Sequence, residues 1–155
     1  TVDTVRERQH PGLVDNAHWN RIAATAWALD ESRRKGRKYA QQVIANAKTL
    51  ARALHEEGLP VKCADYGFTE SHQVILDIKD EERIDRFTSA LEEANIIVDR
   101  GVRLGTNETT RRGMRQREME RIAAMIARIY NGEEPARIRR LAVRLRREFN
   151  TIQYT

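Results

Sequence analysis

Apolar side chains recur at helical spacing along five stretches of the chain, and this pattern predicts a mostly helical protein. The stretches are residues 15–30, 39–54, 80–94, 116–130 and 135–149. Asp15 or Asn16 can cap the first helix, and Gly58 can close the second. Pro135 stands in the first turn of the last helix, a position that proline favours. The residues around Gly36 are polar, so the first two helices either join with a kink or break there.

Four short apolar runs separate these helices and predict the strands of a small sheet. They are residues 59–64, 73–78, 96–98 and 102–104. The first two resemble an antiparallel hairpin with a long connection. Residues 1–14 contain Pro11 and Gly12 and are expected to be an irregular lead-in, whereas residues 15–155 form one domain. The order of the elements predicts an α+β fold, with a small, mostly antiparallel sheet and helices packed on one face.

The composition fits one compact unit. A chain of 155 residues with 40% hydrophobic and 33% charged side chains is ordinary for a globular domain. No apolar run approaches the roughly 18 residues that span a bilayer, and no secretory signal is recognised, so we expect no membrane partner. The single cysteine, Cys63, cannot form an internal disulfide, which suits the cytoplasm. Because it follows Val61 in a predicted strand, we expect a packed thiol rather than a nucleophile.

The net charge of +5 and the pI near 9.7 raise the question of an anionic partner. Most arginines are spread along the chain and alternate with glutamates, as in residues 117–121, which indicates solvated helix faces. In residues 138–149, four arginines crowd one side of a helix: Arg139, Arg140, Arg144 and Arg147. Neither zinc-finger spacing nor an aromatic RNA-binding motif accompanies them. We therefore expect no nucleic-acid partner, and keep a basic helical nucleic-acid-binding domain as an alternative.

One short segment carries candidate chemistry. Val102 and Leu104 alternate with Arg103, so a strand would bury the two apolar side chains and turn the guanidinium to the other face. Gly105 allows a tight turn, and residues 106–110 offer N-caps for a following helix. An arginine at a strand end beside a helix N-terminus suits an anion. The spacing alone favours the plainer interpretation, an exposed arginine in a strand-turn-helix unit without a ligand.

Residues 101–113 resemble the signature S-G-I-R-x-G-T-x-x-T-T-R-G of the serine hydroxymethyltransferases, which are pyridoxal-phosphate enzymes of the aminotransferase fold. Three more segments resemble motifs of that family, in the family's order. Residues 17–29 are similar to H-x-x-A-A-x-A-x-A-L, residues 39–50 to Y-A-x-Q-V-x-x-N-A-K-x-L, and residues 69–77 to T-D-N-H-x-x-L-x-D. The match corresponds to the C-terminal third of such an enzyme.

The resemblance implies that residues 15–155 are the aminotransferase-like C-terminal small domain of the enzyme, with the catalytic large domain absent. In the family, the arginine matching Arg103 binds the α-carboxylate of the amino-acid substrate. We therefore expect Arg103 to bind substrate, and Thr106, Thr110 and Arg111 to hold its loop. The implied reaction cleaves or forms the Cα–Cβ bond of a β-hydroxy amino acid such as serine or threonine, as part of one-carbon and amino-acid metabolism.

The lysine that forms the Schiff base with pyridoxal phosphate belongs to the family's large domain, in a T-T-H-K motif. None of the lysines here stands in such a setting: Lys35, Lys38, Lys48, Lys62 and Lys79. We expect no catalytic residue in this chain, no activity of the chain alone, and pyridoxal phosphate bound only in the parent enzyme. The expected partners are the missing large domain, fused or as a separate chain, the amino-acid substrate and further copies in a cytoplasmic homodimer or other homo-oligomer.

Two departures from the family modify this expectation. The family has a longer segment, part of which helps to hold folate, where Asp99 and Arg100 here lead straight to Gly101, so the use of tetrahydrofolate is doubtful. Residues 11–15 retain little of a glycine-rich stretch that contacts cofactor phosphate in the family. A folate-independent aldolase or transaldolase of the same fold fits both losses. A regulatory domain is a further alternative, which a buried internal ion pair at Arg103 with no cleft beside it would favour.

Overall fold

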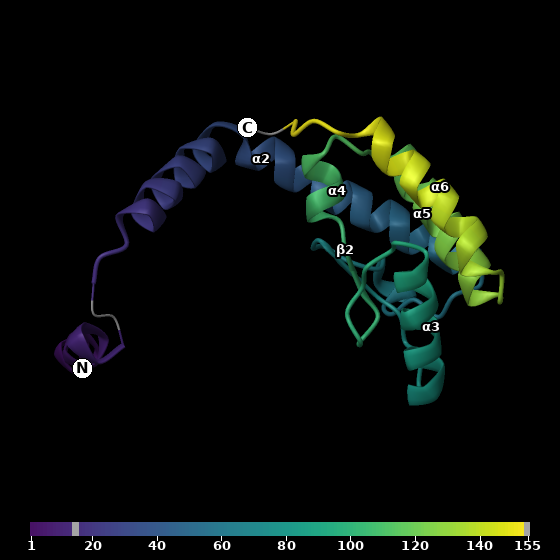
Figure 1. Cartoon of the computed structure of the whole chain (residues 1–155), viewed down its shortest axis with the longest axis horizontal. Helices are drawn as coiled ribbons and strands as arrows, with labels where there is room; N and C mark the ends of the chain where they lie inside the picture. Colours follow the sequence, from purple (N-terminus) through teal and green to yellow (C-terminus); the bar gives the residue numbers. More distant parts are fainter. Residues whose placement is uncertain (14–15, 154–155) are drawn as a thin grey trace. The chain divides into compact units, whose positions relative to one another are not determined.

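The computed structural model describes residues 1–13 and 16–153, and it divides into two compact units, Thr1–Arg34 and Lys35–Thr155 (Figure 1). Each unit is described by itself. The first contains α1 (Val2–Glu7), the π-helical turn η1 (Arg8–Leu13) and the first part of α2 (Trp19–Glu56). All the other elements belong to the second unit.

Residues 2–7 are helical where the sequence predicts an irregular lead-in over residues 1–14. The Thr1 hydroxyl caps α1 by accepting a hydrogen bond from the Thr4 N–H at 3.4 Å. Extended backbone at His10, with φ −131° and ψ 126°, interrupts the following turn just before Pro11, where proline disfavours helical geometry. Of the two candidate caps of α2, Asp15 lies outside the described residues.

Helix α2 runs without interruption through Gly36, so the two helices predicted on either side of that residue are one. From Val43 onward the helix buries the apolar stripe that its periodicity predicts, with Ala47, Leu50 and Leu54 at most 3% exposed. Gly58 follows the helix with a φ of +86°, a conformation that glycine adopts without strain. The stripe and the closing glycine are therefore confirmed.

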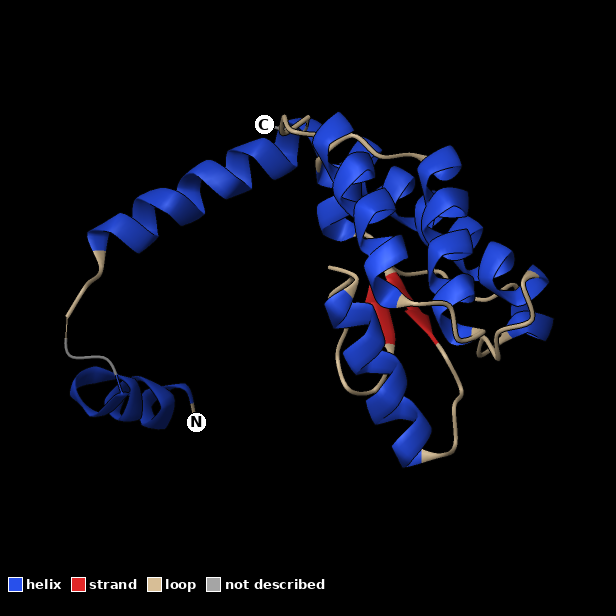
Figure 2. Ribbon diagram, turned by 45° about the vertical axis from the view of Figure 1, so that its right-hand side comes forward, coloured by secondary structure: helices blue, strands red, loops and turns tan. Residues whose placement is uncertain are grey.

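The sheet consists of two short antiparallel strands, β1 (Gln73–Ile75) and β2 (Arg103–Gly105). In the register, Val74 lies opposite Leu104 and Ile75 opposite Arg103. Figure 2 shows these strands flanked by helices. Antiparallel strands beside helices confirm the predicted α+β class.

Two of the four predicted strands do not form. Residues 59–64 contribute only an isolated antiparallel bridge between Val61 and Leu76. Cys63 then turns the chain with a φ of 59°, and its side chain is exposed rather than packed, which corrects the prediction for this thiol. It leads into the 3-10 turn η2 (Ala64–Tyr66). Residues 96–98 are also not a strand, since Asn95 reverses the backbone with a φ of 60°.

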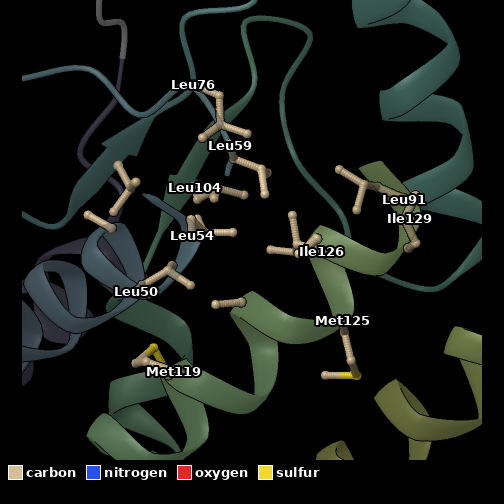
Figure 3. Packing of buried hydrophobic residues seen from close by; sticks show 14 of the residues in the cluster. Leu50, Leu54, Leu59, Leu76, Leu91, Leu104, Met119, Met125, Ile126 and Ile129 are labelled. Carbon is tan, nitrogen blue, oxygen red and sulfur yellow. The ribbon is translucent and has the colours of Figure 1, made fainter. Parts of the chain in front are cut away.

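Four further helices complete the second unit: α3 (Glu81–Glu93), α4 (Asn107–Arg111), α5 (Gln116–Tyr130) and α6 (Pro135–Glu148). Helix α5 contacts both α3 and α6, and Met119, Ala123 and Ile126 on it are fully buried. Figure 3 shows Ile126 directed toward the leucines of α2 and β2. The core thus lies between α5, the end of α2 and the two strands. In β2, Leu104 is buried in this core, whereas Arg103 and Gly105 are exposed.

Among the described residues, none of the helices is both long enough and apolar enough to cross a membrane.

Candidate functional site

Arg103 begins β2, between two buried neighbours. Val102 is fully buried, Leu104 is 6% exposed, and the side chain of Arg103 is 55% exposed. Strand alternation therefore turns the guanidinium away from the core, as the sequence predicts. A turn that begins at Asp99 precedes the strand, and it is closed by a hydrogen bond from the Val102 N–H to the Asp99 carbonyl at 3.0 Å. The turn holds Val102 at a φ of 47°, which is strained for a β-branched residue.

The Arg103 guanidinium binds a carboxylate within the chain. Its Nε and Nη2 both contact Oδ2 of Asp99, and the Arg103 backbone N–H donates to Oδ1 of the same carboxylate at 2.9 Å. The backbone N–H and the guanidinium of Arg103 lower the pKa of the Asp99 carboxyl, because they bind its ionised form. A buried ion pair at Arg103 would favour a regulatory domain. The pair observed here is internal to the chain, but the Arg103 side chain is exposed, so it is not such a buried pair.

Thr106 ties the end of β2 to the rest of the second unit. Its buried hydroxyl donates to the Val43 carbonyl at 3.0 Å and to the His72 carbonyl at 3.3 Å, and its N–H also donates to His72. The residue precedes α4, but its side chain makes no capping hydrogen bond. Thr106 thus occupies the predicted N-cap position, but it does not cap α4 with its side chain, because its hydroxyl binds the Val43 and His72 carbonyls instead.

Thr110 and Asn46 form a buried polar network behind this loop. The Thr110 hydroxyl donates to the Thr106 carbonyl at 2.6 Å and accepts from the Asn46 amide at 2.8 Å. The same amide donates to the Met114 carbonyl at 2.9 Å, and the Asn46 oxygen accepts from Gln42 at 2.9 Å. Both Asn46 and Thr110 are fully buried. The sequence analysis does not include Asn46 among the predicted site residues. The signal that could have identified it is a polar residue on the apolar stripe of residues 39–54.

The remaining predicted site residue, Arg111, lies in the helix that follows this loop. Arg111 ends α4, and its carbonyl accepts from the Gln153 N–H at 2.9 Å, while Arg112 pairs with Glu108 at 2.6 Å. An apolar hollow of about 430 Å³ opens beside β2, with Leu104 and Thr106 in its lining. Arg103 is not among the lining residues, so the guanidinium lies outside this hollow.

Three lysines of the second unit form ion pairs with carboxylates. Lys48 pairs with Glu70, while Lys62 and Lys79 both pair with Asp77, at 3.3 and 2.7 Å. Their side chains are between 43 and 80% exposed. A Schiff-base lysine works from a desolvated pocket, whereas these three side chains are exposed and paired with carboxylates. In the described parts of the chain, no group of histidine, cysteine and carboxylate side chains could hold a metal ion.

Comparison with known proteins identifies the family. The sequence model of serine hydroxymethyltransferase matches residues 2–126. Serine hydroxymethyltransferases of Methanopyrus kandleri and Methanocaldococcus jannaschii are each 41% identical to this chain over 99% of its length. The match covers 40% of the first relative and 41% of the second, so the chain spans about two-fifths of the curated relatives.

A solved structure agrees with the sequence comparison. The crystal structure of L-threonine transaldolase from Pseudomonas fluorescens, in its internal aldimine state, superposes with a TM-score of 0.87 and 32% identity. It covers 94% of this chain and 36% of that one. Because the sequence model spans most of the chain and the fold agrees, this chain belongs to the serine hydroxymethyltransferase family of fold-type I pyridoxal-phosphate enzymes.

Proposed function

We propose that this chain is the C-terminal, substrate-carboxylate-binding domain of an enzyme that cleaves or forms the Cα–Cβ bond of a β-hydroxy amino acid. One observation carries the proposal: a half-exposed guanidinium on β2 already binds a carboxylate, that of Asp99, through Nε and Nη2. Arginine suits this task because its planar donors match the two oxygens of a carboxylate.

The proposed role of Arg103 is to position the substrate. A substrate carboxylate held on the guanidinium fixes the orientation of the bonds at Cα, and such fixing contributes to catalysis by reducing the entropy lost in the transition state. Thr106, Thr110 and Arg111 would hold the loop that carries Arg103, and the hydrogen bonds from Thr106 to Val43 and His72 support this part of the proposal. Asn46 would support the same loop through Thr110.

The lysines with described partners do not fit the task of holding pyridoxal phosphate, because they are exposed and paired with carboxylates. We therefore assign the cofactor to the large domain of the parent enzyme, and expect the chain alone to be inactive. The proposed assembly is a cytoplasmic homo-oligomer, and the exposed free thiol of Cys63 supports a reducing compartment.

The test of the carboxylate site is Arg103→Lys in the complete enzyme, with the large domain fused or supplied as a separate chain. Lysine keeps the charge but removes the paired donors, so a contact of roughly 1.5–3 kcal/mol is weakened. Catalytic efficiency should fall about ten- to a hundredfold. The assay compares a β-hydroxy amino acid with its amide, and the wild-type preference for the acid should largely disappear in Arg103→Lys.

The matched control is Arg100→Lys. Arg100 lies three residues away, is 86% exposed and pairs with Asp85, so it should leave the preference for the acid unchanged. Equal discrimination between acid and amide by wild type and Arg103→Lys would place the carboxylate site elsewhere and overturn the proposal.

A second candidate function is a folate-independent aldolase or transaldolase. Two observations favour it: Asp99 and Val102 close a tight turn with a 3.0 Å hydrogen bond where the family has a longer segment, and a threonine transaldolase shares the fold. The alignment with the Methanopyrus kandleri relative runs over 169 positions, whereas this chain has 155 residues. The relative therefore has residues at positions where this chain has a gap. Threonine cleavage without tetrahydrofolate, alongside no folate-dependent conversion of serine, would establish this candidate. The reverse result would exclude it.

A further inference from the structure

Helix α6 carries the entire net charge of the chain. The chain has 28 basic and 23 acidic side chains, a net charge of +5. Helix α6 contains six arginines and one glutamate, which is also +5, so the other residues together are neutral. A charge this concentrated creates a local field that a dispersed charge would not. The opposite face of the helix is anchored in the core through Ile138 and Leu145, which fixes the direction of the arginines.

Four of these arginines share one exposed face. Arg140, Arg144 and Arg147 follow one another at four and three residues, the spacing of neighbours on a helix surface, and Arg139 lies alongside them. An open hollow of about 780 Å³ lies over this face, lined by the four arginines, Val143 and Glu148. We call the four side chains the α6 arginine face.

The α6 arginine face lacks counter-ions within the described parts of the chain. Several arginines elsewhere are paired; for example, Arg128 binds Glu133 through two hydrogen bonds of 2.7 and 2.6 Å. The one acid of α6, Glu148, is bound by Arg121 at 2.9 and 3.2 Å. The pKa of Glu148 is lowered mainly by its hydrogen bond from Arg121. Arg144 lowers it further, but only through its charge and without a hydrogen bond. Four adjacent guanidinium groups therefore repel one another, and an external polyanion would relieve that repulsion.

The chemistry of the face selects among polyanions. A membrane surface would need an apolar helix face to enter the bilayer, and that face of α6 is occupied by core packing. Helix α6 has no aromatic side chain on which bases could stack, and no asparagine or glutamine to read them. Guanidinium groups are well suited to phosphate oxygens. From Arg139 to Arg147 the helix advances about 12 Å, which matches three to four base-pair steps of a duplex.

We propose that the α6 arginine face binds the phosphate backbone of double-stranded nucleic acid, without reading its sequence. This binding is separate from the carboxylate site on β2 and does not depend on the proposed enzymatic function. Up to four phosphates would be contacted, one by each arginine. DNA and RNA duplexes present the same phosphate chemistry, so both are probes of one surface.

The test measures fluorescence anisotropy of a labelled 20-base-pair DNA duplex and of the matching RNA duplex with the full 155-residue chain. Between 50 and 200 mM salt, the logarithm of the binding constant should fall with the logarithm of salt, with a slope of about −3 to −4 for four phosphates. The double variant Arg140→Gln, Arg144→Gln should reduce that slope by about 2 and weaken binding at every sequence tested. Thermal unfolding of each variant verifies that the fold is retained.

The control is the double variant Arg86→Gln, Arg100→Gln. It removes the same charge from two arginines that are 71 and 86% exposed and lie outside α6. It should bind duplexes as wild type does. An equal loss of binding in both double variants would show a response to net charge alone and overturn the proposal. Salt-independent binding, no binding at 50 mM salt, or a preference for phosphatidylserine vesicles over duplexes would also overturn it.

Discussion

Asp99 and Arg103 form a pair that is both an anchor and a potential obstacle to substrate. The Asp99 carboxylate occupies the guanidinium that we propose for the substrate carboxylate, and it also accepts the Arg103 backbone N–H. Its lowered pKa keeps Asp99 ionised, so the pair persists at neutral pH and is lost only as the pH falls through that lowered value. If Arg103 binds the substrate as proposed, the substrate carboxylate must displace the carboxylate of Asp99.

Replacing Asp99 with asparagine should make substrate binding easier. Asparagine keeps an oxygen for the Arg103 N–H but removes the charge that competes for the guanidinium. In the complete enzyme, Asp99→Asn should lower the KM for the amino acid several-fold and leave kcat almost unchanged. Asp85→Asn, which removes the partner of Arg100, is the control and should change neither. A higher KM in Asp99→Asn would show that Asp99 positions Arg103 instead of competing for it.

Asn46 is the residue on which the loop behind β2 depends most. Replacing it with leucine keeps a similar volume but removes hydrogen bonds to the Thr110 hydroxyl and the Met114 carbonyl. Unsatisfied buried groups cost about 1–3 kcal/mol each, so the free energy of unfolding should fall by about 2–4 kcal/mol in Asn46→Leu. Urea unfolding of the 155-residue chain measures this.

The matched control for Asn46→Leu is Gln42→Ala. Gln42 belongs to the same network: its amide donates to the Asn46 oxygen at 2.9 Å in a part-buried bond and to Gln116 at 3.1 Å at the surface. This control should cost about 1 kcal/mol or less. Equal costs for the two variants would contradict a special role for Asn46.

At the scale of the element, α2 changes its environment along its length. Within the second unit it buries a continuous stripe, whereas within the first unit its large apolar side chains are exposed. Trp19 is 76%, Trp27 70% and Leu29 65% exposed. Exposed apolar surface of this kind is typical of faces that contact another protein.

The chain should therefore self-associate when it is purified alone. Trp19→Gln combined with Trp27→Gln removes the two largest exposed apolar side chains and should shift the chain toward monomer in sedimentation velocity. The control Ile97→Gln removes an apolar side chain of the second unit that is 76% exposed and should leave association unchanged. A wild-type chain that stays monomeric at high concentration would contradict the expectation.

At the scale of the whole molecule, we expect that the chain alone does not hold pyridoxal phosphate covalently. Lys48, Lys62 and Lys79 are exposed and paired with carboxylates. A Schiff-base lysine instead works from a desolvated pocket. The charge and exposure of these side chains therefore agree with a site completed by the rest of the enzyme.

Mixing the chain with pyridoxal phosphate should produce no specific internal aldimine. Borohydride reduction followed by peptide mapping should find no lysine modified in stoichiometric amount, and the matched sample is the complete enzyme, where one lysine of the large domain should be modified. Stoichiometric modification of any lysine of this chain would contradict the prediction.

Local pattern was sufficient for much of the fold. The periodicity of residues 39–54 and 116–130 predicts helices that the structure contains, because an amphipathic stripe repeats at the helical period wherever it is buried. The alternation around Arg103 likewise predicts a strand with the guanidinium turned outward, because side chains on a strand alternate between its faces. These properties depend on neighbours in the sequence.

Tertiary structure decided what distant segments do for one another. The Thr106 hydroxyl binds the Val43 carbonyl instead of capping α4, and Asn46 binds Thr110 across 64 residues of sequence. Cys63 is exposed where the pattern predicts a strand, because a reversed backbone ends the apolar run. Hydrogen bonds between remote segments depend on which groups the fold brings within about 3 Å, and periodicity contains no such information. The sequence by itself thus determined the helices and the outward arginine, while the fold determined which remote groups Thr106 and Thr110 bind.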